Sequence, residues 1–597
     1  MATTKSIGLT IEGVLQALFP RGYLDHERYL KGLKQKSAPA WPTTFEHPPC
    51  RAVDLFAIAG FLLLRSGAYH HVSPEVSMTH MPRTISVTQE ERDRWREAGA
   101  EWRGDGKGDL PAPPRLLLEA WAEVLAHRHR NVYRAHSALK QPRKWWRAAL
   151  ALLCIADEAA KDLGFETGLG KSAQARFAEI GMRRGGTRVF TVSVADPDQV
   201  CVLPKSRTPK VGCTLRSLSH NLALLPPRGM ARSFWTMGPP RDEPASTSAP
   251  FNLLVVPAPF QIRAAAFRGV PADEGTWGWF EVEPHWCPPS QEADQPSPGF
   301  DTFYTFVNDL ILKAEEDVGV VHGLVFPEAA LSDEIFRRLC RRLLERPNFE
   351  LLIAGLFDAK MDGDPLRRGN FAAMAAFQPG AEEAEAGFNI SIREKHHRWR
   401  IDGSQIETYA LGSALDVNRG WWERIDIMSR SLDMFVLRGV ATVTTLICED
   451  LARNDPCQEL VRGIGPNLVV ALLMDGPQLK NRWPARYATV LAEDPGSSVL
   501  TVTSLGLIAR TNSAGHFPPA RQVGLWQDDS GKAIELSLPN GAQALCLSLQ
   551  PSTLHERTLD GRSDAGASQS WRLTGIAPIT IEADAQIMAG DWPSGAV

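Results

Sequence analysis

The sequence predicts a two-part protein: a mainly α-helical N-terminal region, residues 1–236, followed by an α/β domain, residues 251–550. Helical periodicity dominates the first part, whereas apolar β-branched runs alternate with helical patterns in the second. Residues 237–250, MGPPRDEPASTSAP, are rich in proline, acidic and small polar residues, which is typical of a linker. A tail rich in Gly, Ser and Asp, residues 551–597, is expected to be irregular.

The composition is that of an ordinary globular protein. The 597 residues carry a formal net charge of −4, with 22% charged and 44% hydrophobic residues, which excludes a disordered or uniformly basic chain. The nine cysteines include no C-x-x-C pair, which argues against a disulfide framework or a thiolate zinc site. Because the start lacks a secretory pattern and the apolar run 55–64 is too short to span a bilayer, we expect a cytoplasmic protein that does not enter the membrane.

Three segments of the N-terminal region are predicted as helices. Residues 88–98 begin with Thr88 as N-cap and Glu91 as its capping-box partner. Residues 114–128 and 142–163 show the apolar spacing of helices that face a core. The last of these is rich in Ala and Leu, which favours a core helix of a helical domain.

Two acid-free basic stretches in the same region suggest an alternative function. In the first, residues 127–147, Tyr133, Trp145 and Trp146 interleave with the basic side chains, an arrangement that single-stranded nucleic acid or a phosphorylated ligand would use. The second, residues 199–241, is predicted as a loop or a β-rich connection that could receive an anion. The candidate contacts are Arg134, Arg143, Lys144, Lys205, Arg207 and Lys210. A solvated basic face whose tryptophans turn into the core explains the same pattern.

In the α/β domain, three apolar runs each lead to one reactive side chain. Residues 323–326 precede Pro327 and Glu328, the alternating run 388–392 leads to Lys395, and residues 439–447 end at Cys448. Open α/β sheets bind ligands outside the carboxyl ends of their strands, so a substrate could reach these positions. A carboxylate can take the proton of a thiol, and a cation can lower the pKa of the thiol and stabilise an oxyanion.

The pieces VFPE at Glu328, REKHH at Lys395 and LICED at Cys448 resemble the three signature motifs of the nitrilase (carbon-nitrogen hydrolase) superfamily, in the same order. The resemblance covers roughly residues 250–550. It implies an α-β-β-α sandwich that forms a homodimer or larger homo-oligomer.

The resemblance also implies a thiol hydrolase of non-peptide carbon-nitrogen bonds that needs no metal or cofactor. In such an enzyme Glu328 takes the proton of Cys448, the thiolate attacks an amide or nitrile carbon, and Lys395 with the backbone N–H of Glu449 stabilises the oxyanion. The triplet at 448–450, Cys-Glu-Asp, is similar to glutamine-hydrolysing members and favours amides over nitriles. The family often has a second glutamate between its lysine and cysteine motifs, for which Glu407 is the candidate.

The helical N-terminal region is not part of a minimal nitrilase. It resembles prokaryotic multidomain proteins in which a nitrilase-like domain works beside another module, including proteins of phage-defence systems, although the sequence has no polymerase motif. Three hypotheses follow: an amidohydrolase with a regulatory or partner-binding N-terminal domain, a nitrilase-fold protein that binds a nucleic acid or nucleotide, and an assembly subunit.

Overall fold

The computed structural model describes most of the chain in two compact units. The described residues are 9–35, 45–75, 84–105, 108–133, 141–165, 172–176, 178, 188–209, 215–229, 231–236, 249–289, 295–361, 365–377 and 387–593. Unit 1 comprises Met1–Met237, Leu460–Gly465 and Thr553–Gln569. Unit 2 comprises Gly238–Glu459, Pro466–Ser552 and Ser570–Val597.

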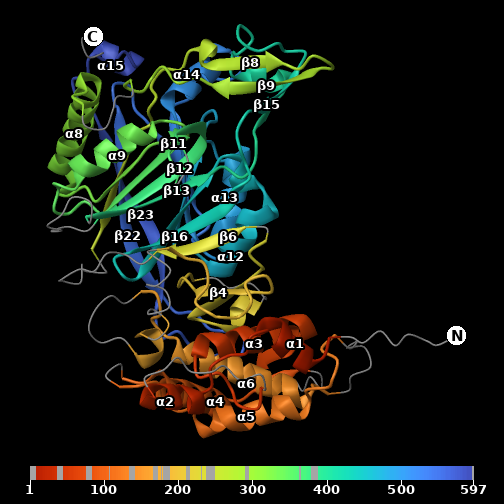
Figure 1. Ribbon diagram of the computed structural model, residues 1–597. Coiled ribbons are helices and arrows are strands. Elements are labelled where there is room, and N and C mark those ends of the chain that lie inside the picture. Colours follow the sequence, from red (N-terminus) through yellow and green to blue (C-terminus); the bar gives the residue numbers. More distant parts are fainter. Residues whose placement is uncertain are drawn as a thin grey trace. The chain divides into compact units, whose positions relative to one another are not determined.

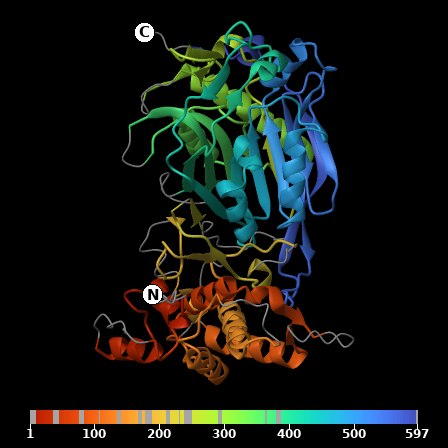
Figure 2. The same ribbon diagram turned by 90° about the vertical axis from the view of Figure 1, so that its right-hand side faces the viewer.

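Unit 1 is built mainly from helices (Figure 2), and three of them, α3, α4 and α5, pack on α6 (Lys144–Ala159). Thr88 and Glu91 form the predicted capping box, and α6 is almost entirely buried, as a core helix should be. Short strand pairs accompany the helices, and one of them, β4 with β5, lies in residues 199–241, for which a loop or a β-rich connection was predicted. The elements are α1 (Ile11–Leu18), α2 (His26–Gln35), α3 (Ala52–Ser66), η1 (Ala68–His71), β1 (Val72–Pro74), β2 (Ile85–Val87), α4 (Gln89–Arg103), α5 (Arg115–Ala126), α6 (Lys144–Ala159), β3 (Arg188–Val189), β4 (Cys201–Pro204), η2 (Leu215–Leu218), β5 (Leu222–Leu225), β6 (Arg232–Thr236) and α12 (Glu459–Ile464).

Unit 2 has the expected mixed α/β architecture. Its elements are β7 (Phe251–Val255), η3 (Ala264–Ala266), β8 (Phe267–Pro271), β9 (Trp277–Val282), α8 (Pro298–Val318), β10 (Gly323–Val325), α9 (Asp333–Leu343), β11 (Leu351–Ala359), β12 (Arg367–Phe377), β13 (Phe388–Glu394), β14 (Arg400–Ile401), α10 (Gly403–Thr408), β15 (Gly420–Glu423), β16 (Ser431–Leu437), β17 (Ala441–Ile447), α11 (Glu449–Ala452), η4 (Asn454–Gln458), β18 (Leu468–Leu473), α13 (Trp483–Glu493), β19 (Ser498–Thr503), α14 (Leu505–Ser513), β20 (Gln522–Gln527), β21 (Ala533–Ser537), β22 (Ala544–Leu554), β23 (Ser568–Ile579) and α15 (Ala585–Ala589).

Two sheets form the centre of unit 2. One has the strand order β13-β12-β11-β10-β7-β22-β23, and the other contains the order β21-β20-β19-β18-β17-β16. The sheets contact each other through β12 with β17 and β13 with β16. Helices α8 and α9 pack on the first sheet, and α11 and α13 pack on the second, so four layers result (Figure 1).

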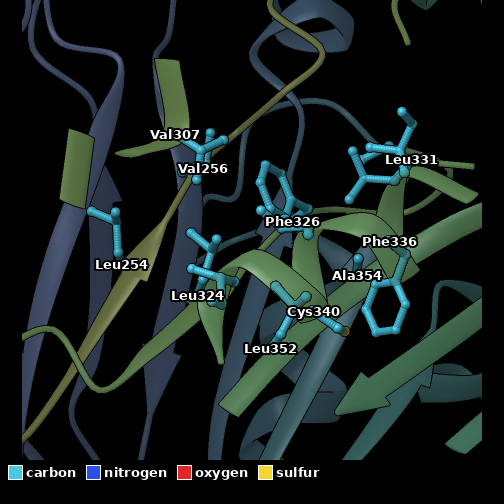
Figure 3. Packing of buried hydrophobic residues seen from close by; sticks show 14 of the residues in the cluster. Leu254, Val256, Val307, Leu324, Phe326, Leu331, Phe336, Cys340, Leu352 and Ala354 are labelled. Atoms are coloured by element: carbon cyan, nitrogen blue, oxygen red, sulfur yellow. The ribbon is translucent and has the colours of Figure 1, made fainter. Parts of the chain in front are cut away.

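A large apolar core fixes the strand that carries the first motif. Leu324 and Phe326 pack with Leu254 and Leu352 of the neighbouring strands and with Phe336 of α9 (Figure 3). Parallel pairing on both sides, with β7 and β11, holds β10 in the middle of its sheet. The end of β10 is therefore a rigid position for a functional side chain.

A third, smaller sheet comes from two separate insertions. Its order is β14-β15-β9-β8, with β15 parallel to β9 and the outer pairs antiparallel. The sequence did not indicate that residues 420–423 pair with β9. This sheet contributes Glu423 to the site described below.

The C-terminal region differs from the irregular tail expected from its composition. Residues 568–579 form β23 at the edge of the seven-stranded sheet, and residues 553–569 belong to unit 1. Alternation of buried and exposed residues over β23, with Trp571 inside, explains why this Ser-rich segment is a strand. Most of the predicted linker, residues 237–248, lies outside the described residues. Among the described helices, none combines the length and the apolar character that a membrane span requires.

Candidate active site

Glu328 lies just after β10, where Pro327 ends the strand. Its side chain is buried, and its Oε1 accepts hydrogen bonds from Lys395 Nζ at 2.9 Å and from Asn370 Nδ2 at 2.7 Å. Its Oε2 is buried without a hydrogen-bond partner among the described residues. One carboxylate oxygen is thus fixed in place, and the other is free to accept a proton.

Lys395 follows β13 and is fully buried. Besides Glu328, its Nζ donates to Glu423 Oε2 at 2.8 Å. Asn370 on β12 bridges the same two carboxylates, since its Nδ2 also donates to Glu423 Oε1 at 2.7 Å. The backbone N–H of Lys395 donates to the Asn370 carbonyl at 2.8 Å, which ties the two strands together at this point.

Cys448 follows β17 and precedes α11, as the sequence predicted for a thiol at a strand end. Its backbone has φ 42° and ψ −107°, a conformation that residues other than glycine rarely adopt. Residues hold such strained conformations where the surroundings impose them, and functional sites are a common place for them. The next residue, Glu449, opens α11, where a backbone N–H has no intrahelical acceptor.

The charges of the three motifs act on one another. Burial raises the pKa of the Cys448 thiol well above its ordinary value; the Glu328 carboxylate adds to this, and Lys395 opposes it. Burial likewise raises the pKa of Glu328, although Lys395 pulls it down. Burial alone would lower the pKa of Lys395, but the carboxylates of Glu328 and Glu423 outweigh burial and raise it well above the ordinary value. At neutral pH the thiol is therefore protonated and the ammonium charged.

A second buried network joins the lysine and cysteine motifs. Asp450 accepts hydrogen bonds from the backbone N–H of His396 at 3.0 Å and from Arg393 Nη1 at 3.1 Å. His396, Asp450 and Cys457 also lie close enough together to hold a metal ion. The Arg393 guanidinium on Asp450 already supplies a positive charge there, and His396 Nδ1 lies 2.9 Å from Cys457 Sγ, so a hydrogen-bonded support explains the cluster better than a cation site.

A cavity of about 280 Å³ opens beside Asn370 and Glu423, the two residues that contact Glu328 and Lys395; the side chains of Glu328, Lys395 and Cys448 themselves do not line it. Asn370 and Glu423 lie in its wall together with Ala329, the residue after Glu328. The remaining wall combines apolar side chains with charges: Phe280, Glu281, Val282, Phe357, Arg368, Gly369, Arg424, Ile425, Asp426 and Met474. Strands β9 and β15 of the small sheet thus form part of the cavity.

Glu407, the candidate for a second glutamate, does not contact the site, and another glutamate does. Glu407 is exposed on α10, whereas Glu423 is 5% exposed and contacts Lys395. Sequence reasoning also missed Asn370. A signal for Glu423 existed, because GWWE is an aromatic run that ends in one carboxylate, the same form as the run before Glu328.

The basic candidates of unit 1 mostly serve its own packing. Lys205 is buried and donates to the carbonyls of Arg216, at 2.9 Å, and Ser219, while Arg207 pairs with Asp162. Arg143 packs over Trp146, and Lys144 is exposed at the start of α6. Arg134 and Lys210 lie outside the described residues.

Two of the three aromatic residues interleaved with the first basic stretch are buried, whereas Tyr133 is 48% exposed. Trp145 and Trp146 are each 1% exposed. They cannot stack on bases in this conformation, which favours the interpretation as a core helix.

Comparison with known proteins gives a limited result. No family model matches the sequence, and no curated protein matches it either. Among solved structures, an amidase from Nesterenkonia sp. aligns with 50% of this chain and 90% of its own at 12% identity and a TM-score of 0.28.

Two further solved structures align over a similar part of the chain. A carbon-nitrogen hydrolase from Helicobacter pylori G27 covers 48% of this chain and 85% of its own, at 9% identity and a TM-score of 0.26. Saccharomyces cerevisiae Nit3, a member of branch 10 of the nitrilase superfamily, covers 49% and 88%, at 12% identity and a TM-score of 0.25.

The amidase, the carbon-nitrogen hydrolase and the nitrilase-superfamily member each align with about half of this chain.

Proposed function

We propose that unit 2 is a thiol-dependent amidohydrolase of the carbon-nitrogen hydrolase superfamily, with Cys448 as nucleophile and Glu328 as general base. The main support for this proposal is that one oxygen of the Glu328 carboxylate is held by hydrogen bonds and the other is not. Lys395 and Asn370 hold its Oε1, and its Oε2 has no partner among the described residues. A buried carboxylate that has one free oxygen and whose charge acts on a protonated thiol is suited to accept the proton of that thiol.

The proposed reaction begins with a proton transfer because the resting thiol is neutral. As the Cys448 sulfur forms a bond to the amide carbon, its proton passes to Glu328. Lys395 and the backbone N–H of Glu449 stabilise the negative oxygen of the tetrahedral intermediate. The C–N bond then breaks, and Glu328 returns the proton to the departing amine.

Water completes the cycle by attacking the thioester on Cys448. Glu328 takes the proton of the water, the C–S bond breaks, and the sulfur recovers its proton as the carboxylic acid leaves. Lys395 stays protonated throughout because Glu423 faces it at every step, together with the Glu328 carboxylate in the resting enzyme and the oxyanion in the intermediate.

The cavity favours an amide over a nitrile. Asn370 directs its Nδ2 at two carboxylates, so its Oδ1 must face elsewhere, and this oxygen is buried without a partner among the described residues. A primary amide has N–H groups that could satisfy such an acceptor, whereas a nitrile has none. A site with a fixed hydrogen-bonding group discriminates strongly against analogues that leave it unpaired.

The size of the cavity points to a small substrate. Its volume of about 280 Å³ is near the lower end of the range for small-molecule sites. Phe280, Phe357 and Met474 offer apolar contacts to the acyl group.

The test is ammonia release from paired amides and nitriles that share an acyl group. We expect release from at least one small amide, with the matching nitrile slower, and a loss of at least about 10³-fold in Cys448→Ala because no other group supplies the nucleophile. Cys201→Ser, in unit 1, is the matched control and should retain full activity.

Ammonia release that persists in Cys448→Ala would contradict the proposed nucleophile. If a nitrile is turned over faster than the matching amide, the role proposed for Asn370 is contradicted, whereas the assignment of Cys448 as nucleophile is not affected.

A further inference from the structure

The residue after the proposed base is held by a tryptophan from a distant part of unit 2. Trp286 Nε1 donates a hydrogen bond to the carbonyl of Ala329 at 3.2 Å. Ala329 has φ 51°, a left-handed conformation that a residue with a side chain keeps only when its surroundings impose it. The hydrogen bond therefore acts on the backbone at the point that sets the direction of Glu328.

Trp286 is in turn held by the C-terminal segment, residues 585–593. Trp592 Nε1 donates to the Trp286 carbonyl at 2.9 Å. Gly590, with φ 79°, lies so close that a Cβ there would be 2.7 Å from the Cα of Trp286. A larger residue would push the two backbones apart.

The C-terminal segment is itself anchored on α8 (Figure 1). The rings of Trp592 and Phe303 meet edge to face, with centroids 5.5 Å apart. A Cβ at Gly299 would lie 2.8 Å from the Pro593 carbonyl, which shows a second close approach. Contacts thus run without a break from α8 through Trp592 and Trp286 to Ala329.

We infer that Trp286 and Trp592 are positioning residues for Glu328, so that the C-terminal segment sets the geometry of the proposed general base. Simple packing would require only apolar contact between this segment and the core. The two indole N–H groups instead each donate to a backbone carbonyl along the path to Ala329. The inference rests on the proposed function, because it takes Glu328 as the base of Cys448.

The test follows alkylation of Cys448 by iodoacetamide as a function of pH, with the modified peptide quantified by mass spectrometry. The Glu328 carboxylate raises the pKa of Cys448 and Lys395 lowers it. Glu328→Gln should therefore move the midpoint of alkylation to lower pH.

Trp286→Phe and Trp592→Phe keep the ring and lose the N–H. We expect both to move the midpoint in the same direction as Glu328→Gln, by roughly half a pH unit, because a displaced carboxylate acts less on the thiol. The double variant should shift no further than Trp286→Phe alone if the effect passes through Trp286.

Asp591→Asn is the matched control, since Asp591 is exposed in the same segment. Its midpoint should equal that of the wild type. A Glu328→Gln shift without any shift in the tryptophan variants would overturn the positioning role and leave the proposed function intact.

Two other outcomes would also overturn the inference. Faster alkylation of the buried Cys340 in the tryptophan variants, with no change of midpoint at Cys448, would indicate general loosening. If the midpoint of Cys448 alkylation in Glu328→Gln equals that of the wild type, both the positioning role and the assignment of Glu328 as the base are contradicted.

Discussion

Lys395 is the residue on which the electrostatics of the site depend. Its ammonium is fully buried and donates to two carboxylates, Glu328 and Glu423. Burial of an unpaired charge is costly, so the pairs keep the lysine charged in a dry environment. Glu423 also draws the ammonium away from Glu328 and so preserves the basicity of the proposed base.

Glu423→Gln should therefore lower turnover without unfolding the protein. With one partner neutral, Lys395 pairs more tightly with Glu328 and makes it a weaker base. We expect kcat for the best amide to fall by about 10- to 100-fold. Glu407→Gln, a change at an exposed glutamate on α10, is the matched control. Equal effects of the two changes would contradict the role given to Glu423.

At the scale of single elements, β11 and the loop after β10 approach closely because β11 has a glycine at the crossing. A Cβ at Gly355 would lie 2.4 Å from the Cα of Glu328 and 2.5 Å from the Pro327 carbonyl. Gly355 N–H donates to that carbonyl at 3.0 Å, and its own carbonyl accepts from Ala330 at 2.9 Å. The glycine thus allows the backbone of β11 to hydrogen-bond with the loop that carries Glu328.

Gly355→Ala should disturb both stability and activity, because backbone atoms on both sides must move apart. The free energy of unfolding should fall by about 1–3 kcal/mol, as in other overpacked cores, and ammonia release should fall as Glu328 shifts. Gly412→Ala is the control, because a Cβ at Gly412 meets nothing within 4 Å. Denaturant unfolding and amide turnover of the two variants give the comparison. Unchanged stability in Gly355→Ala would contradict the close approach.

The sequence was sufficient for the elements whose signals are local. Thr88 and Glu91 marked a helix start, and apolar runs marked the strands that lead to Glu328, Lys395 and Cys448. Glu423 could not be placed in this way. Its strand, β15, is four residues long and is recognisable only through its pairing with β9, far away in the chain.

At the scale of the whole molecule, the two units do not follow the linear order of the chain. Residues 553–569 belong to unit 1 although they follow most of unit 2 in the sequence. Within unit 1, Arg562 from this segment is fully buried among Asp157, Glu158 and Asp560. Composition predicted an irregular tail here because it cannot show which distant carboxylates an arginine will meet.

Arg562→Met should destabilise unit 1 strongly, because it leaves buried carboxylates without their cation. Breaking one side of a buried ion pair typically costs about 3–5 kcal/mol. Chemical unfolding monitored in unit 1 would measure the loss, with Arg557→Met, at an exposed position of the same segment, as the control. A loss below about 1 kcal/mol would show that Arg562 does not hold this segment in unit 1.

Mass spectrometry of the protein quenched during turnover of its best amide tests Cys448 as the nucleophile most directly. We expect Cys448 to carry the acyl group of the substrate, with the amine already released, and the adduct to disappear as the substrate is consumed. Cys448→Ala should carry no adduct. Turnover without an acyl group on Cys448, or an adduct on another residue, would contradict a nucleophilic Cys448.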